Sequence, residues 1–119
     1  MGFCYFNNIA IAAARLIETG RSRVAVLDID CHHGNGTEEI LAPRREALYL
    51  SLHQAPLYPG TGLESRGNAR NWPLAPGTGE GGYLEALDRA LEEIAGFGPS
   101  ILGVSAGFDT YRGDPLSHM

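Results

Sequence analysis

The stretch Val24-Ala-Val-Leu-Asp-Ile-Asp30 decides the fold, and Cys31-His-His-Gly-Asn-Gly-Thr37 follows it directly. The first part is a short, almost continuous apolar run rich in β-branched residues, which is typical of a strand buried on both faces of a parallel sheet. The glycines of the second part allow the backbone to turn sharply away. We therefore predict an inner strand that ends in carboxylates and histidines.

The elements around this strand indicate an α/β fold. Further strands are predicted at 47–52 and 100–105, and helical periodicity covers 5–19 and 81–95, with one or two helical turns at 37–41. Helices that alternate with buried strands predict a mainly parallel sheet with flanking helices. The apolar stripe of the second helix is assigned to the core and comprises Leu84, Leu87, Leu91 and Ile94. The range 53–80 has no period, so we expect a long loop there, anchored by Trp72.

Composition excludes several classes of protein. The 119 residues fit one domain, and the net charge of −5 argues against a nucleic-acid surface or a polybasic membrane surface. No apolar run approaches the ~20 residues that span a bilayer, and no secretory signal is seen. Two cysteines favour a reducing compartment, so a cytoplasmic location is expected. All nine basic residues are arginines, which excludes lysine Schiff-base and P-loop lysine chemistry.

Acidic side chains and a histidine are expected to meet where the strands end. Alternation along an extended chain would put Asp28, Asp30 and His32 on one side, with Cys31 and His33 facing away. Asp109 follows the last predicted strand, although taken alone it fits a turn or cap residue better than a ligand. One histidine and two aspartates would hold Zn²⁺ or a similar ion and leave a position for water, as in catalytic sites. The cysteines Cys4 and Cys31 are assigned to packing.

Several motifs in this order resemble the histone deacetylase family, including its bacterial acetylpolyamine amidohydrolases and acetoin-utilisation-type proteins. They are Gly2-Phe-Cys-Tyr-Phe-Asn-Asn8, Asp28-Ile-Asp-Cys-His-His-Gly-Asn-Gly-Thr37, Tyr49-Leu-Ser-Leu-His53, Tyr58-Pro-Gly-Thr-Gly62, Asn71-Trp-Pro-Leu74, Pro76-Gly-Thr-Gly79 and Ser105-Ala-Gly-Phe-Asp-Thr-Tyr-Arg-Gly-Asp-Pro-Leu116. The resemblance covers essentially the whole chain. It implies an arginase/deacetylase-like three-layer fold and metal-dependent removal of acetyl groups from acetyl-lysine or acetylated polyamines.

The resemblance also implies roles for individual residues. Zinc, or iron(II), would be bound by Asp30, His32 and Asp109. A structural potassium ion would be bound by Asp28, Asp30, His32, Ser51 and Leu52. The family's two catalytic histidines would have Asp28 and Asn35 as hydrogen-bond partners. The channel for the acetylated amine would be lined by Gly2, Phe3 and Tyr58.

Two parts of the family's active site lie outside the matching motifs. The tandem histidines of the family precede the GFCY motif, and its oxyanion-stabilising tyrosine follows the GDPL motif, so residues 1–119 are expected to be the central part of a single catalytic domain. Two hypotheses follow: a zinc-dependent deacetylase, or a catalytically silent metal-binding piece or interaction module. A dehalogenase-like phosphatase is rejected because the chain has no lysine. Absent flanking strands would expose a sheet edge or helix face, which predicts homo-oligomers, complementation by a partner or poor solubility.

Overall fold

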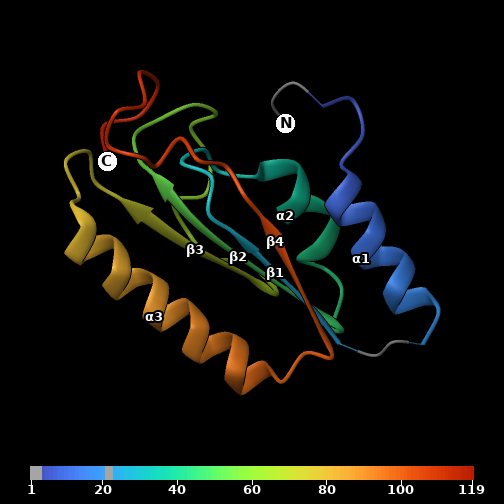
Figure 1. Cartoon of the computed structure of the whole chain (residues 1–119). Helices are drawn as coiled ribbons and strands as arrows, with labels where there is room; N and C mark the ends of the chain where they lie inside the picture. Colours follow the sequence, from blue (N-terminus) through green and yellow to red (C-terminus); the bar gives the residue numbers. More distant parts are fainter. Residues whose placement is uncertain (1–3, 21–22) are drawn as a thin grey trace.

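A parallel four-stranded sheet forms the centre of the computed structural model, which describes residues 4–20 and 23–119. Its strands lie in the order β3-β2-β1-β4, and every neighbouring pair is parallel (Figure 1). They are β1 (Val24–Asp28), β2 (Ala47–Gln54), β3 (Ala69–Leu74) and β4 (Ile101–Ser105). The three strands predicted from apolar runs are present, and β1 and β2 are buried along their whole length.

Helices cover both faces of the sheet and complete three layers. On one face lie α1 (Asn8–Glu18) and α2 (Asn35–Leu41), and on the other lies α3 (Glu80–Phe97) (Figure 1). The helix predicted from residue 5 begins at Asn8, because the Asn7 side chain accepts a hydrogen bond from the Ala10 amide and caps it. No helix in the described ranges is long and apolar enough to cross a membrane. The α/β fold with a parallel sheet and flanking helices is confirmed.

The long loop predicted over residues 53–80 is wrong, because β3 lies within it. This strand pairs with β2 from Tyr49↔Ala69 to Gln54↔Leu74. Its sequence, ARNWPL, has neither an apolar run nor regular alternation, and a proline normally argues against an inner strand. At the outer position of the described sheet, Pro73 is tolerated because one side of an edge strand needs no ladder partner. Trp72 therefore packs from a strand against the α3 layer, not from a loop.

The segments that contain the candidate ligands leave the sheet at the carboxyl ends of its strands. Because all described strands are parallel, the residues after β1, β2 and β4 emerge at the same end, where they lie close together above the arrowheads in Figure 1. The strand β1 ends at Asp28, two residues before the end of the predicted run. Asp30 and the residues after it thus belong to a bent segment, which is decisive for the site.

Candidate metal centre

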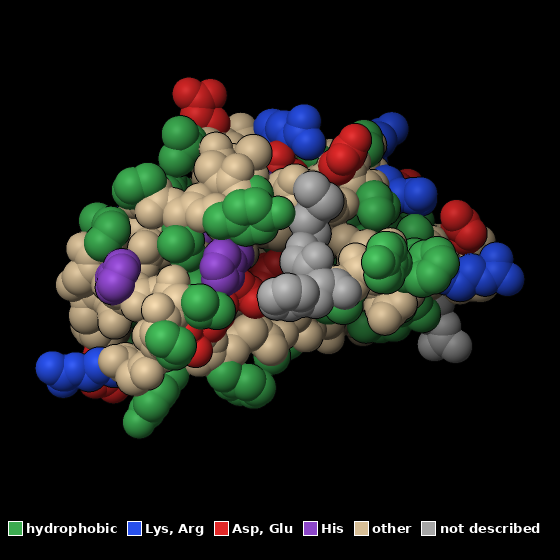
Figure 2. Space-filling view, turned by 90° about the horizontal axis from the view of Figure 1, so that it is seen from above, with side chains coloured by type: hydrophobic (Ala, Val, Ile, Leu, Met, Phe, Trp, Pro, Cys, Tyr) green, Lys and Arg blue, Asp and Glu red, His purple; other side chains and the backbone are tan. Residues whose placement is uncertain are grey.

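Four side chains bring their donor atoms together at the carboxyl ends of the strands. The nearest ligand atoms of Asp30, Cys31, His32 and Asp109 all lie within 4.8 Å of one another. The Nδ1 atom of His32 is 3.0 Å from Asp30 Oδ1 and 2.8 Å from Asp109 Oδ2. In the view from above, a histidine side chain lies beside acidic side chains in a recess of the surface (Figure 2). The structure therefore brings together the predicted group Asp30, His32 and Asp109.

Backbone contacts hold the two carboxylates in place. Asp30 Oδ1 accepts a hydrogen bond of 2.7 Å from the His32 amide, and Asp109 Oδ1 accepts one of 2.9 Å from the Cys31 amide. Gly107 lies so close to the Asp30 carboxylate that a Cβ atom at this position would overlap it. The turn after β4 thus needs a glycine to carry Asp109 next to the turn after β1.

Cys31 departs from the prediction that it faces away from the ligands. It is fully buried, as expected, but its Sγ atom is 3.3 Å from His32 Nδ1. The prediction assumed extended alternation as far as His32, whereas β1 ends at Asp28 and the following residues bend. Burial, and then the hydrogen bond and charge of Asp109, raise the pKa of the Cys31 thiol above its ordinary value. The sequence gives no signal for this placement.

The donor set fits a zinc ion. Burial alone would raise the pKa of Asp109, but hydrogen bonds from the Cys31 amide and thiol and the neighbouring His32 charge hold it below its ordinary value. A charged carboxylate, a second carboxylate and an imidazole nitrogen that converge on one point are the ligand types zinc takes in proteins. A cation there would offset the repulsion between the carboxylates.

Asp28 lies apart from the donor group, contrary to the prediction that it shares their side. Its carboxylate accepts hydrogen bonds from the Tyr49 hydroxyl at 2.9 Å and from the Asp30 amide at 3.2 Å. Burial raises the pKa of Asp28 to about 6, and the Tyr49 hydrogen bond opposes this shift. Asp28 is paired in register with Ser51 on β2, and both Ser51 and Leu52 are fully buried. The potassium ligands implied by the resemblance stay a prediction.

The remaining predicted residues occupy separate positions. Asn35 is the first residue of α2. Tyr58 lies in the segment between β2 and β3 and is 62% exposed. Gly2 and Phe3, predicted to line the channel, lie outside the described residues. The roles of all four stay predictions.

His33 faces away from the donor group, as predicted. It contacts Glu38, a residue that the sequence patterns do not indicate. Its Nε2 donates to Glu38 Oε2 at 2.8 Å, and its Nδ1 is 2.8 Å from Thr61 Oγ1. Burial would raise the pKa of Glu38, but hydrogen bonds from Asn71 and Arg66 and the charge of His33 hold it below its ordinary value. An acidic residue six positions after His32 carries no motif of its own, so only the structure reveals this cluster.

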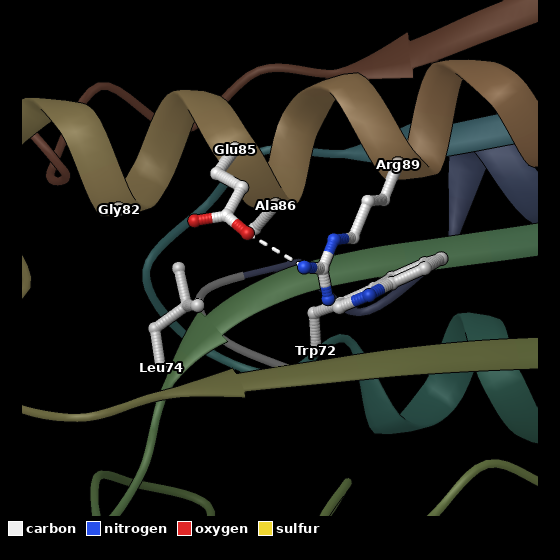
Figure 3. Close-up of a pocket in the computed structure, with 6 residues that line it drawn as sticks. All are labelled: Trp72, Leu74, Gly82, Glu85, Ala86 and Arg89. Atoms are coloured by element: carbon white, nitrogen blue, oxygen red, sulfur yellow. Dashed lines mark hydrogen bonds and ion pairs between the residues drawn. The ribbon is translucent and has the colours of Figure 1, made fainter.

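A second concave site lies away from the donor group, between β3 and α3. Its lining residues are Trp72, Leu74, Gly82, Glu85, Ala86 and Arg89 (Figure 3). An exposed ion pair of 2.6 Å joins Arg89 to Glu85, and the Arg89 guanidinium lies beside the indole of Trp72. The charges of Arg89 and Glu85 are paired with each other here, and the residues that line this site do not include a group of metal-ligand atoms like the one at the strand ends.

Comparison with known proteins identifies the family. The family description "Histone deacetylase domain" matches residues 1–119. The chain belongs to the histone deacetylase family. Its similar relatives include a probable deacetylase of Archaeoglobus fulgidus, 42% identical over 99% of this chain and 35% of the relative, and an acetylpolyamine amidohydrolase of Burkholderia pseudomallei, 45% identical over 99% and 37%. The chain thus spans little more than a third of the length of these relatives.

Solved structures of this family share the fold. The crystal structure of the acetylpolyamine aminohydrolase from B. pseudomallei superposes with a TM-score of 0.91 at 45% identity, over 98% of this chain and 37% of that one. The crystal structure of an HDAC homologue from Aquifex aeolicus gives a TM-score of 0.91 at 32% identity, over 100% and 35%. The three-layer arrangement of the histone deacetylase family is therefore established for this segment.

Proposed function

We propose that this chain is the metal-binding, central part of a single catalytic domain that removes acetyl groups from acetyl-lysine or acetylated polyamines with the help of zinc. The observation that supports the proposal most is the convergence of Asp30, His32 and Asp109 on one point at the strand ends. Membership of a deacetylase family and relatives named for acetylpolyamines support the substrate class. The free thiols Cys4 and Cys31 agree with the proposed cytoplasmic location.

In this proposal the residues of the chain bind the metal and orient the catalytic histidines, and none of them acts as the general acid or base. Asp30, His32 and Asp109 would bind the metal, which supplies a polarised carbonyl and an acidified water when bound. Asp28 and Asn35 would orient the catalytic histidines, and Tyr58 would line the channel with Gly2 and Phe3. Asp28, Asp30, His32, Ser51 and Leu52 would bind potassium beneath the site. The mixed nitrogen and oxygen donor set favours zinc, with iron(II) as the competing metal.

A silent chain is the second candidate, and it rests on the family motifs that the resemblance places outside residues 1–119. The chain covers only 35% and 37% of the two relatives described above. The resemblance implies that the tandem histidines and the oxyanion-stabilising tyrosine of the family belong to the sequence outside this match. General acid–base groups contribute about 10²–10⁴ in rate, and an oxyanion donor about 10²–10³. On this reading the isolated chain binds metal without measurable turnover.

One assay separates these candidates. The isolated chain, and a chimera in which it replaces the matching segment of the B. pseudomallei amidohydrolase, are stripped with a chelator and reloaded with zinc or iron(II). Each is tested on a fluorogenic acetyl-lysine substrate and an acetylated polyamine. Zinc-dependent hydrolysis by both supports the deacetylase as it stands, and hydrolysis by the chimera alone supports the silent chain. A folded chimera that hydrolyses neither substrate would overturn the proposed function.

A further inference from the structure

A buried carboxylate stands at the centre of a polar cluster beside the metal centre. Glu38 of α2 is only 6% exposed, and its carboxylate accepts hydrogen bonds from His33 Nε2 at 2.8 Å, Arg66 Nε at 2.5 Å and Asn71 Nδ2 at 2.6 Å. A buried charge is costly unless it is paired and fully hydrogen-bonded. These three donors satisfy Glu38, and they come from the turn after β1, the end of the β2–β3 segment, and β3 itself.

The middle of the β2–β3 segment, residues 55–68, rests on two imidazole rings. The rings of His33 and His53 lie 4.7 Å apart, and both bond to neighbouring residues of this segment. His33 Nδ1 is 2.8 Å from the Thr61 hydroxyl, and His53 Nε2 donates to the Gly62 carbonyl at 3.0 Å. Gly62 has a φ of +80°, and a Cβ atom there would overlap both rings. The fit between rings and backbone is therefore tight.

The end of the same segment is held by the Glu38 partners. Asn71 Nδ2 also donates to the Glu64 carbonyl at 2.9 Å, and the Asn71 amide donates to Ser65 Oγ at 3.0 Å. Arg66, which bonds Glu38, forms a bridge with Ala69 at the start of β3. Segment 55–68 is thus attached at its middle through His33 and at its end through Arg66 and Asn71, with Glu38 common to both attachments.

These contacts join two parts of the proposed active site. His33 directly follows the metal ligand His32, and Tyr58 lies three residues before Thr61. We propose that Glu38 is a positioning residue: through His33 and Arg66 it fixes segment 55–68, and with it Tyr58, relative to the metal-binding turn. The consequence for substrate rests on the proposed function, whereas the attachment itself does not.

The test removes one bond of the cluster at Thr61 while the buried charge is kept, and in a separate variant it removes the charge of Glu38. In Thr61→Val the hydroxyl that reaches His33 is lost, in Thr61→Ser it is kept, and Glu38→Gln neutralises the centre. The control is Thr78→Val, because the Thr78 hydroxyl bonds the Ala75 carbonyl in the turn before α3. The first readout is amide hydrogen exchange of residues 57–64 in the isolated chain, which needs no catalysis.

We expect Thr61→Val and Glu38→Gln to exchange at least about five-fold faster across this segment, as one lost hydrogen bond predicts, while Thr61→Ser and Thr78→Val match the wild type. Unchanged exchange in Glu38→Gln would overturn the role of Glu38, and unchanged exchange in Thr61→Val would overturn the attachment through His33, whatever the activity of the protein.

The second readout is steady-state kinetics in the chimera described above. Thr61→Val should raise KM for the acetylated substrate several-fold while kcat stays within about two-fold, because a loosened channel wall weakens binding of substrate and transition state alike. Faster exchange with an unchanged KM would overturn the link between Glu38 and Tyr58. A chimera without turnover in any variant would contradict the proposed function, and amide exchange would still decide the attachment.

Discussion

At the scale of single residues, the environment of Cys31 is the least expected feature of the centre. A buried thiol, Cys31, lies among two carboxylates and an imidazole. The other cysteine, Cys4, is exposed, so its assignment to packing is wrong. Thiolates react and thiols do not, so a raised pKa and burial both suppress reactivity. The two cysteines therefore form an internal comparison within one molecule.

We predict that iodoacetamide labels Cys4 and leaves Cys31 unmodified in the folded, metal-free chain. The physical reason is the burial of Cys31 and the raised pKa of its thiol beside Asp109. Mass spectrometry of the digested protein measures both sites, with labelling in denaturant as the control for complete reaction. Equal labelling of the two cysteines in the folded chain would show that Cys31 is not enclosed as described.

His53 makes folding stability depend on pH. Burial, with the neighbouring charge of His33, lowers the pKa of His53 to about 4 from 6.5. The folded state therefore resists protonation, and its stability is complete above the unfolded pKa of 6.5 and is lost as pH falls toward 4. The neutral ring accepts from the Ser51 hydroxyl at 2.9 Å and donates to the Gly62 carbonyl, which fits its enclosed position.

We expect the free energy of unfolding to fall by about 3 kcal/mol between pH 6.5 and pH 4 because of His53 alone. Denaturant unfolding of the wild type and His53→Gln at several pH values isolates this contribution, since the other titrating groups are common to both. The difference between the two proteins should shrink as the pH falls. A difference that is constant over this range would refute the depressed pKa.

At the scale of elements, the segment between β2 and β3 contains two glycines that are required for different physical reasons, one for its backbone conformation alone and one also for lack of space. Gly60 and Gly62 have similar positive φ values, +77° and +80°. Beside Gly60 a Cβ atom would meet no atom within 4 Å, whereas beside Gly62 it would overlap His33 and His53. The two positions separate backbone strain from packing.

Gly60→Ala is predicted to lower the free energy of unfolding by about 1–2 kcal/mol, the cost of a left-handed conformation for a residue with a Cβ atom. Gly62→Ala adds an overlap with two imidazole rings and should cost roughly 1–3 kcal/mol more. Thermal or denaturant unfolding measures both. If Gly62→Ala is no less stable than Gly60→Ala, the rings do not pack against this backbone as described.

The elements also show how far sequence patterns reach. Apolar runs predict β1 and β2, which are buried along their whole length, and also β4, which is only partly buried. Amphipathic periodicity predicts α1 and α3, but the core stripe assigned to α3 is partly wrong, because Leu84 and Leu91 are exposed, whereas Ala86, Ala90 and Ile94 are buried. The strand β3 was missed because Arg70, Asn71 and Pro73 hide its extended character, which comes from pairing with β2. In the site, Asp30, His32 and Asp109 follow from strand ends and family motifs. Cys31 and Glu38 do not, because their positions depend on a bend after Asp28 and on contacts distant in sequence.

At the scale of the whole molecule, the outer strand β4 leaves apolar side chains exposed. On β4, Leu102 is 45% exposed and Val104 is 51% exposed, and both point to the same face because residues alternate along a strand. Exposed apolar side chains on an outer strand are typical of surfaces that pair with another chain. Leu63, in the segment after β2, is 65% exposed but lies on no strand.

We therefore predict that the isolated 119-residue chain forms dimers or larger oligomers through β4. Leu102→Lys should shift it to the monomer, because a charge on an edge strand opposes pairing, while Leu63→Lys should have no effect. Light scattering coupled to size-exclusion chromatography over a range of concentrations measures the mass. A wild-type chain that stays monomeric throughout would contradict the exposed-edge interpretation.

The most direct test of the proposed metal centre is the zinc affinity of the chain, measured by titration calorimetry. The wild type should bind one zinc ion per chain at the donor group. Asp109→Asn, which keeps an oxygen to accept from the Cys31 amide, should weaken binding by at least about ten-fold because a charged ligand is lost. Asp88→Asn on the exposed face of α3 is the control and should bind as the wild type does. Equal zinc affinity in Asp109→Asn and the wild type would contradict the metal centre.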